Sequence, residues 1–441
     1  MRIALIGNMN NNNFAVMRYC RDLGIDAHLF LYSTDGRGSL SHFKPESDTW
    51  NIDKWQPYIH QTEFENGPLS GSSGIWSILV RLINIIPFKG KRGDGLSSKY
   101  ARNKQIRNKF ESFDYTIGTG IAAALFHKAG LRLSCFVPYG AGIEFVGALP
   151  YQKRMSKGVI LKRMIFKNVF KNQLNGVRNS NYCFNAELGL TKDVLDSYRI
   201  KFENLAMPMV YNNEILKSHE EQNFKGIIEQ LKEADYRIIS HGRQYWVNPG
   251  GYSKNDWESR SKHNEWLINS FSRIIGKKPD INPILVLLEY GDDFEHTKAL
   301  CKKLGIEDSV VWLGKMNRRE IMKLIRHCDL GIGEFYKAHG TIWGGTGWEI
   351  LSCGKPFVQG FNFNEGEFES SFGHPPPPIL GAKTERDVET QIIKAINNPE
   401  WALKIGKESE DWFNAYNGIE LTKNWLRVIC DENELPVGFD N

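Results

Sequence analysis

A glycine-rich stretch in the second half of the chain, "HGTIWGGTGWEILSCGKPFV" (339–358), combines residues that could hold an anion. Gly344, Gly345 and Thr346 directly precede an expected helix. Glycines let a ligand approach the backbone, and the free N–H groups and dipole of a helix N-terminus attract a diphosphate. Glu349 would lie in the first turn, where its carboxylate can accept hydrogen bonds from both hydroxyls of a ribose. A plain glycine-rich turn with an acidic residue that favours the helix dipole explains the same spacing.

Two cations are placed where they could neutralise such a diphosphate. Arg243, in "SHGRQYW", lies at the carboxyl end of an expected strand, and Lys262, in "SKHNEWLINSF", comes just before an expected helix. Ligands of open α/β sheets bind at the carboxyl ends of the strands. Two cations that converge there would stabilise charge on a nucleotide leaving group. Taken singly, each is equally explained as a solvated surface residue.

The elements that must position these residues alternate between strand and helix in both halves of the chain. The first half opens with "RIALIG", an Asn-rich loop, a helix and a second strand, and the second half opens with "YRIISHGR" (236–243). This rhythm predicts two Rossmann-like α/β domains, which 441 residues can supply. We place the first domain at 1–211, the second at 212–400, and C-terminal helices at 401–441.

The composition indicates in which cellular compartment the protein is found. The seven cysteines include no CxxC pair, which argues against a zinc site or a disulfide scaffold and for a reducing cytosol. The apolar run at the N-terminus is too short for a signal peptide, and no segment reaches the roughly 18 apolar residues of a membrane-spanning helix. We therefore expect a cytoplasmic protein.

Three segments fall in the order seen in a known family. "GR…KHNEWLINSF", "VVWLGKMNRREIMKLIRHCDLGI" and "GGTGWEILSCGKPFV" together resemble the carboxyl-terminal domain of the GT-B retaining glycosyltransferases, most closely glycosyltransferase family 4. The resemblance covers about residues 236–360 well and the first half only in outline. It implies two domains that face each other across a cleft, with the donor in the second, the acceptor in the first, and the C-terminal helices crossing back to the first.

The resemblance also implies roles for single residues. Arg243 and Lys262 would bind the diphosphate of a UDP- or GDP-sugar, and Glu349 would bind the ribose. No cofactor is implied, and neither is a metal: no DxD motif follows a strand, and no His, Cys and carboxylate cluster has ligand spacing. Without an assigned nucleophile, the leaving phosphate itself would take the acceptor proton.

The donor side departs from the family pattern in two ways. Thr341 stands where the family has a first glutamate that contacts the donor sugar, and Glu334 in "GIGEFY" is the carboxylate near enough in sequence to replace it. Arg243 and Lys262 are separated by an inserted loop, "QYWVNPGGYSKNDWESRS", where the family has a short gap. This loop could cover the site or only decorate the surface.

The first half supplies weaker candidates. Gly7 and Asn8 lie in the loop after the first strand, where similar enzymes have a glycine-containing loop near donor phosphate or acceptor. Tyr139 stands where the family has a histidine near the reaction centre, and Glu144 is the nearby carboxylate. A tyrosine can hydrogen-bond a sugar but is a poor general base at neutral pH.

The first half is also basic. Residues 1–211 contain 28 Lys and Arg against 16 Asp and Glu, and the segment 153–178 contains no acidic residue. Arg163, Lys167 and Lys171 recur every four residues beside apolar positions, a pattern typical of a helix that lies on anionic lipid. An ordinary helix with a solvated cationic face explains it as well. Nucleic-acid binding is disfavoured because no recognition motif accompanies the charge.

We therefore expect a metal-independent glycosyltransferase that moves a sugar, with retention, from a nucleotide-sugar to a glycan or lipid-linked acceptor. Cell-surface polysaccharide or glycolipid biosynthesis, at the inner face of the plasma membrane, would suit the basic segment. Two alternatives remain open: a GT-B-like nucleotide-sugar epimerase, and a catalytically silent sugar- or partner-binding module.

Overall fold

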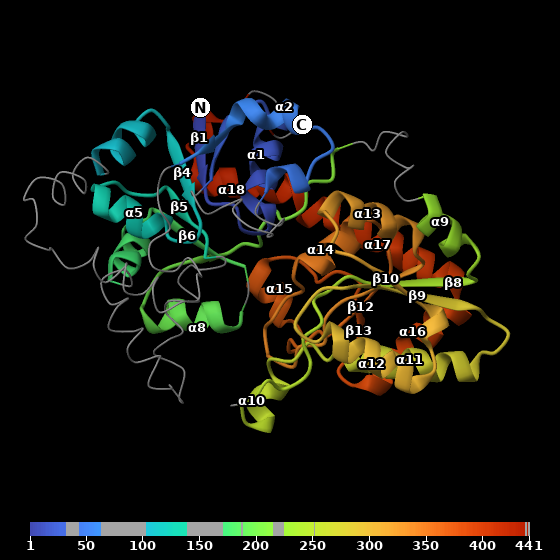
Figure 1. Ribbon diagram of the computed structural model, residues 1–441. Coiled ribbons are helices and arrows are strands. Elements are labelled where there is room, and N and C mark those ends of the chain that lie inside the picture. The colour runs from blue at the N-terminus through green and yellow to red at the C-terminus, as the bar shows by residue number, and fades with distance from the viewer. Residues whose placement is uncertain are drawn as a thin grey trace, which may run out of the picture. The chain divides into compact units, whose positions relative to one another are not determined.

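The computed structural model describes residues 1–31, 44–62, 103–138, 171–186, 188–214, 225–250, 252–436 and 439. The chain folds into two compact units (Figure 1). The first comprises Met1–Pro45, Asn51–Pro208 and Thr422–Asn441, and the second comprises Glu46–Trp50 and Met209–Leu421. The main division therefore falls after residue 208, where the sequence analysis placed it after residue 211.

The first unit is built on a parallel sheet with the strand order β3-β2-β1-β4-β5-β6-β7. Its interior strand β1 has four buried residues out of five, as expected for a strand covered on both faces. The strands are β1 (Arg2–Ile6), β2 (Asp26–Leu31), β3 (Ile59–Gln61), β4 (Tyr115–Gly118), β5 (Cys135–Phe136), β6 (Tyr182–Asn185) and β7 (Glu203–Asn204). The helices with both ends described are α1 (Asn12–Asp22), α2 (Ile52–Trp55), α5 (Ala122–Ala129) and α8 (Leu190–Ser197).

Adjacent residues of β6 show how the two faces of this sheet are covered. Cys183 packs in a core cluster with residues of α5 and of the helical segment 103–110. Phe184 contacts the ring of Trp425 in α18 (Gly418–Ile429), with 5.2 Å between ring centroids. Because neighbouring strand residues point to opposite faces, α18 covers the face opposite α5. The Trp425 indole also donates a hydrogen bond to the Ala206 carbonyl at 2.9 Å, and α18 belongs to the first unit from Thr422 onward.

The second unit has a parallel sheet with the order β10-β9-β8-β11-β12-β13. All six residues of β9 are buried, which is typical of an interior parallel strand. The strands are β8 (Tyr236–Ser240), β9 (Pro283–Leu288), β10 (Val310–Leu313), β11 (Leu330–Ile332), β12 (Phe357–Gln359) and β13 (Leu380–Gly381). The helices are α9 (Lys225–Lys232), α10 (Lys254–Glu258), α11 (Asn264–Lys277), α12 (Phe294–Leu304), α13 (Arg318–His327), α14 (Gly345–Ser352), α15 (Glu367–Phe372), α16 (Glu385–Asn397) and α17 (Pro399–Tyr416).

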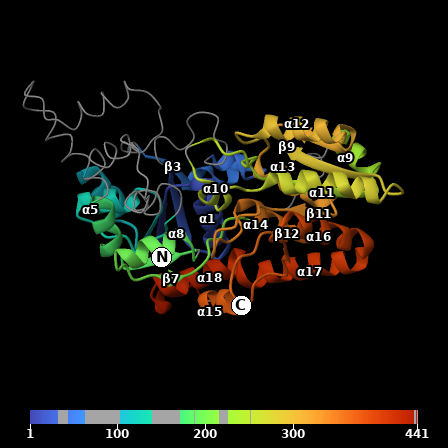
Figure 2. The same cartoon turned by 90° about the horizontal axis from the view of Figure 1, so that it is seen from below.

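Strand β11 separates the two helix layers of this unit. Leu330 and Ile332 pack in the core formed with α11, α12 and α16, and α11 and α12 lie side by side in both views (Figures 1 and 2). Gly331 faces the other layer, where a Cβ atom would come within 2.6 Å of the Ile350 side chain in α14. The missing side chain therefore lets α14 lie directly on the sheet, next to the end of β11.

Candidate functional site

The second sheet reverses its order between β8 and β11. From β8 the chain adds β9 and β10 on one side, then returns to add β11, β12 and β13 on the other. Ligands of such sheets bind beyond the carboxyl ends of the strands at this switch point. His241, Gly242 and Arg243 follow β8, and Glu334 lies two residues after β11, so the predicted residues of both segments lie at this edge.

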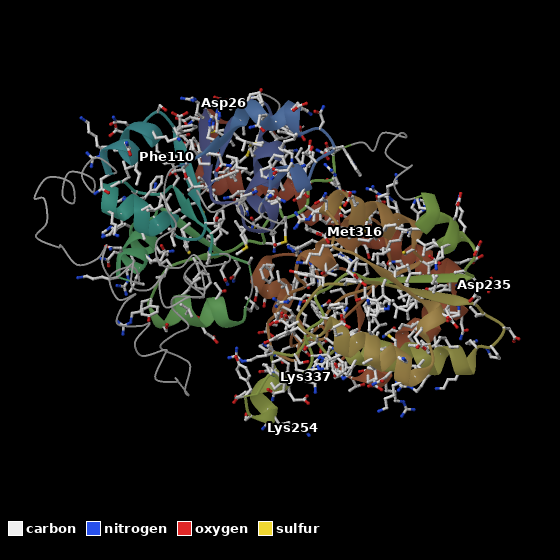
Figure 3. All side chains as sticks on the ribbon, in the orientation of Figure 1. Asp26, Phe110, Asp235, Lys254, Met316 and Lys337 are labelled. Atoms are coloured by element: carbon white, nitrogen blue, oxygen red, sulfur yellow. The ribbon has the colours of Figure 1, made fainter. Side chains whose placement is uncertain are left out.

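The inserted loop between Arg243 and Lys262 is closed at its base. The Lys262 backbone N–H donates to the Tyr245 carbonyl at 2.9 Å, and the Tyr245 N–H donates to Asn264 Oδ1 at 2.9 Å. The loop contains α10, which an ion pair between Glu258 and Lys337 attaches to the segment after β11. Figure 3 labels Lys254, at the start of α10, and Lys337. The chain therefore returns Lys262 to the end of β8 despite the long separation in sequence.

Lys262 is paired with the carboxylate that the sequence analysis proposed as a substitute for the missing glutamate. Its Nζ contacts Glu334 Oε1, and the two side chains are only 9% and 10% exposed. The Glu334 backbone is fixed separately, since its N–H donates to Gln359 Oε1 at 2.7 Å and its carbonyl accepts from the Gly360 N–H at 3.0 Å. A buried cation is thus held at the switch point by a side chain whose own backbone is anchored in the sheet.

Gly242 lies between Glu334 and the start of α14. A Cβ atom on Gly242 would be 3.4 Å from Glu334 Oε1 and 3.9 Å from Thr346 Oγ1. Thr346 is the second residue of α14, and Gly344, its exposed N-cap, has no atom within 4 Å of the position a Cβ would take. The helix start is therefore open on the side of Gly344 and lined by a hydroxyl and a carboxylate near Gly242.

The prediction that Glu349 lies in the first turn of its helix is wrong: α14 begins at Gly345, so Glu349 lies in the second turn, with both carboxylate oxygens engaged. Oε2 is 2.7 Å from His241 Nε2, and Oε1 accepts a hydrogen bond from Arg318 Nε at 2.7 Å. Burial of Glu349 acts to raise the pKa of its carboxyl, but the charge of Arg318 and the hydrogen bond with His241 outweigh that effect and lower the pKa below its usual value. Glu349 is therefore ionised at neutral pH and keeps unused lone pairs for further hydrogen-bond donors.

Arg318 links Glu349 to two further segments of the second unit. Its Nη1 donates to the Met209 carbonyl at 3.0 Å and lies 3.4 Å from Asp48 Oδ1. Neither His241 nor Arg318 was singled out from the sequence. His241 could have been noticed because it follows a strand directly, and Arg318 because it begins a helix with a capping box of Asn317 and Glu320.

The remaining predicted residues are less closely connected. The Arg243 side chain is exposed, with its guanidinium 5.2 Å from the centre of the Tyr245 ring. Thr341 is half-buried in the loop before α14, and no hydrogen bond or ion pair joins it to the other predicted residues among those the structure describes. Tyr139 and Glu144 lie outside the described residues, so their assignment stays a prediction.

The polar groups of the loop after β1 in the first unit bond both to close neighbours in sequence and, through Asn11 Nδ2, to the Lys44 carbonyl at 3.1 Å. Asn8 is buried, its Nδ2 donates to Asn11 Oδ1 at 2.7 Å, and its Oδ1 accepts from the Phe14 N–H of α1 at 3.0 Å. Gly7 adopts a φ of 86°, a conformation that favours glycine. The role of Gly7 and Asn8 in donor binding stays a prediction. The contacts just described show that Asn8 caps a backbone N–H in the first turn of α1.

The predicted membrane-binding segment lies mostly outside the described residues. Its final part, within the helical residues 171–179, buries Val177 in the first unit and exposes Lys171. None of the described helices combines the length and apolar composition that crossing a bilayer requires. In the same part of the chain, no three His, Cys, Asp or Glu side chains are grouped so that they could hold a metal ion.

Comparison with known proteins identifies structures with a similar fold. No protein-family model and no curated protein match the sequence. The structure is similar to that of a glycosyltransferase from Rickettsia africae ESF-5, with a TM-score of 0.56 at 13% identity over 97% of each chain. Sucrose-phosphate synthase from Thermosynechococcus elongatus gives a TM-score of 0.55 at 12% identity, over 97% of this chain and 98% of that one.

A third similar structure is UDP-GlcNAc 2-epimerase from Neisseria meningitidis bound to UDP-GlcNAc. Its TM-score is 0.50 at 10% identity, over 97% of this chain and 99% of that chain. At such identities the likeness establishes the fold and nothing finer. The predicted α/β class with two Rossmann-like domains is confirmed, and the chain has the GT-B type of architecture.

Proposed function

We propose that the protein is a glycosyltransferase that binds the nucleotide diphosphate of its donor sugar at the carboxyl edge of the second sheet. The observation that supports this most is that Glu334, which pairs with Lys262, and Thr346 in the first turn of α14 both border Gly242, at the switch point between β8 and β11. A buried cation and the N–H groups of a helix start are what a diphosphate requires.

Glu349 would bind the ribose. It is ionised, and His241 and Arg318 fix its position, so its carboxylate is oriented before any ribose hydroxyl binds. Arg243, whose exposed guanidinium follows β8 directly, would add a second positive charge to the diphosphate. We propose that the carboxylate that contacts the donor sugar is supplied by Glu334, since position 341 is a threonine.

The finer parts of the proposal come from the resemblance to glycosyltransferase family 4. They are transfer with retention and without a metal ion, an acceptor glycan or lipid-linked sugar bound by the first unit, and a place in surface polysaccharide or glycolipid synthesis. The basic segment 153–178 would bring the enzyme to an anionic membrane. UDP- and GDP-sugars are the donors we propose, and two fold relatives described with UDP-GlcNAc or UDP support the UDP-sugar.

Binding and turnover test this proposal separately. Saturating UDP or GDP should raise the melting temperature, by the usual linkage between ligand binding and stability. Replacing Glu349 or Arg243 with alanine should weaken nucleotide affinity about tenfold or more, the effect of losing one charge-assisted contact. Failure of both nucleotides to bind, or unchanged affinity in both variants, would remove the site assignment.

A nucleotide-sugar epimerase is the second candidate, since such an enzyme shares the fold and a buried carboxylate near the sugar could act as its acid or base. The dependence of donor turnover on an acceptor distinguishes a transferase from an epimerase. A transferase consumes the donor and releases free nucleotide only when an acceptor is added, whereas an epimerase converts the donor alone into its epimer.

A further inference from the structure

Lys262 and Glu334 depend on each other for charge compensation. Both side chains are about nine-tenths buried, and Glu334 Oε1 is the atom that contacts Lys262 Nζ. Removing either partner of such a pair leaves an uncompensated charge in a poorly solvated site. Any anion that binds Lys262 therefore has to replace Glu334 or lie beside it.

The Glu334 carboxylate lies close to where the proposed diphosphate would bind. It contacts the cation, it borders Gly242 at 3.4 Å from the missing Cβ, and Thr346 at the start of α14 borders the same glycine. Two negative groups at this spot repel each other strongly because little solvent screens them. The anchored backbone of Glu334 leaves rotation of its side chain as the simplest way to move the carboxylate.

We propose that Glu334 is the internal counter-anion of Lys262 and thereby selects ligands that carry sugar hydroxyls next to the diphosphate. This rests on the proposed function. A diphosphate alone displaces the carboxylate and leaves it without donors. A diphosphate linked to a sugar supplies hydroxyls to the displaced carboxylate, which offsets the loss of Lys262. Glu334 is thus a specificity-determining residue. It would replace the carboxylate that the resemblance to glycosyltransferase family 4 leads one to expect at the position of Thr341.

The test compares five ligands by titration calorimetry: inorganic diphosphate, the pair UDP and UDP-N-acetylglucosamine, and the pair GDP and GDP-mannose. Glu334→Gln should bind inorganic diphosphate about tenfold more tightly than the wild type, because the competing charge is gone. The preference of the wild type for nucleotide-sugar over nucleotide should shrink by a similar factor in the variant.

Glu389→Gln is the matched control. Glu389 is equally buried and pairs with Arg273 and Lys277 between α16 and α11, in the same unit. Its replacement should change diphosphate affinity less than twofold. Equal or weaker diphosphate binding by E334Q than by the wild type, or no binding to either protein, would overturn the inference.

Two further results keep the test decisive. If E334Q does not fold, Glu334→Asp draws the carboxylate back by one methylene and should still tighten diphosphate binding; unchanged or weaker binding refutes the inference. Inorganic diphosphate has no ribose, so its binding does not depend on Glu349. A failure of UDP and GDP to bind the wild type therefore counts against the proposed function, while the diphosphate result alone decides the role of Glu334.

Discussion

Both units have a glycine after their first strand, at the point where the sheet order reverses. In the first unit, Gly7 follows β1, and the loop that it begins is neutral and filled with amides: Asn8 donates to Asn11, and Asn13 Nδ2 donates to the Gly7 carbonyl at 2.8 Å. In the second unit, Gly242 follows β8, and the groups around it are charged and come from several elements.

The carboxyl edges of the two sheets differ in the kind of partner that their buried polar groups require. An amide is satisfied by neutral partners, and at the edge of the first sheet these include Asn11 in the same loop and the backbone carbonyl of Lys44. A buried carboxylate or ammonium needs a partner of opposite charge, and here the partners of Glu349 and Lys262 lie far away in sequence. Buried charges rarely add stability, and they are concentrated at functional sites. The comparison therefore favours the second edge as the site for a charged ligand.

Arg318→Met should show the largest effect. The substitution removes the guanidinium from Glu349 and Asp48 and leaves their carboxylates buried without it, which costs about 3–5 kcal/mol of unfolding free energy. Denaturant unfolding measures the loss, and UDP titration should show weaker binding because Glu349 is no longer fixed. Arg326→Met, an exposed arginine in the same helix, should cost less than about 0.5 kcal/mol. Equal losses in the two variants would contradict the dependence of this edge on paired charges.

The same contrast explains what the sequence could predict. Alternating strands and helices were sufficient for the fold class, and the order of Arg243, Lys262 and Glu349 was sufficient to propose one edge of the second sheet as the site. The partners were not predictable, because Arg318 and His241 meet Glu349 only after three elements have packed. Even the pairing of Lys262 with Glu334 depends on a loop closed by the Tyr245 and Lys262 backbones, which no local pattern indicates.

Asn8→Ala tests the neutral edge and should cost less, about 1–2 kcal/mol. It removes the acceptor of the Phe14 N–H at the start of α1 and the donor to Asn11, both buried. Thermal and denaturant unfolding measure the change, with the exposed Asn181→Ala of the same unit as the control. A loss no larger than that of the control would contradict the capping role. Weakened UDP binding in the variant would support the predicted donor contact of Asn8.

The pH dependence of Glu349 should be smaller still, about 2 °C in melting temperature. Its pKa in the folded protein is lowered from the usual 4.5, so its ionised contacts stabilise the protein above that value and are lost as the pH falls through the lowered pKa. The difference in melting temperature between the wild type and Glu349→Gln should stay constant from pH 8 to 5 and shrink below pH 4.5. The exposed Glu369→Gln serves as the control, and a difference independent of pH would argue against an ionised Glu349.

Gly344→Ala should leave stability almost unchanged and still weaken binding. Its φ of −77° suits alanine and no atom lies within 4 Å of the new Cβ, so the gain in backbone rigidity and the poorer N-cap should cancel within about 0.5 kcal/mol. The methyl group would, however, occupy the space through which a diphosphate approaches α14, and affinity for UDP should fall about tenfold. Gly276→Ala in α11 also meets no atom within 4 Å, and it should leave the affinity unchanged. Equal affinities in the two variants would mean that the glycines before α14 shape a turn and leave ligand access elsewhere.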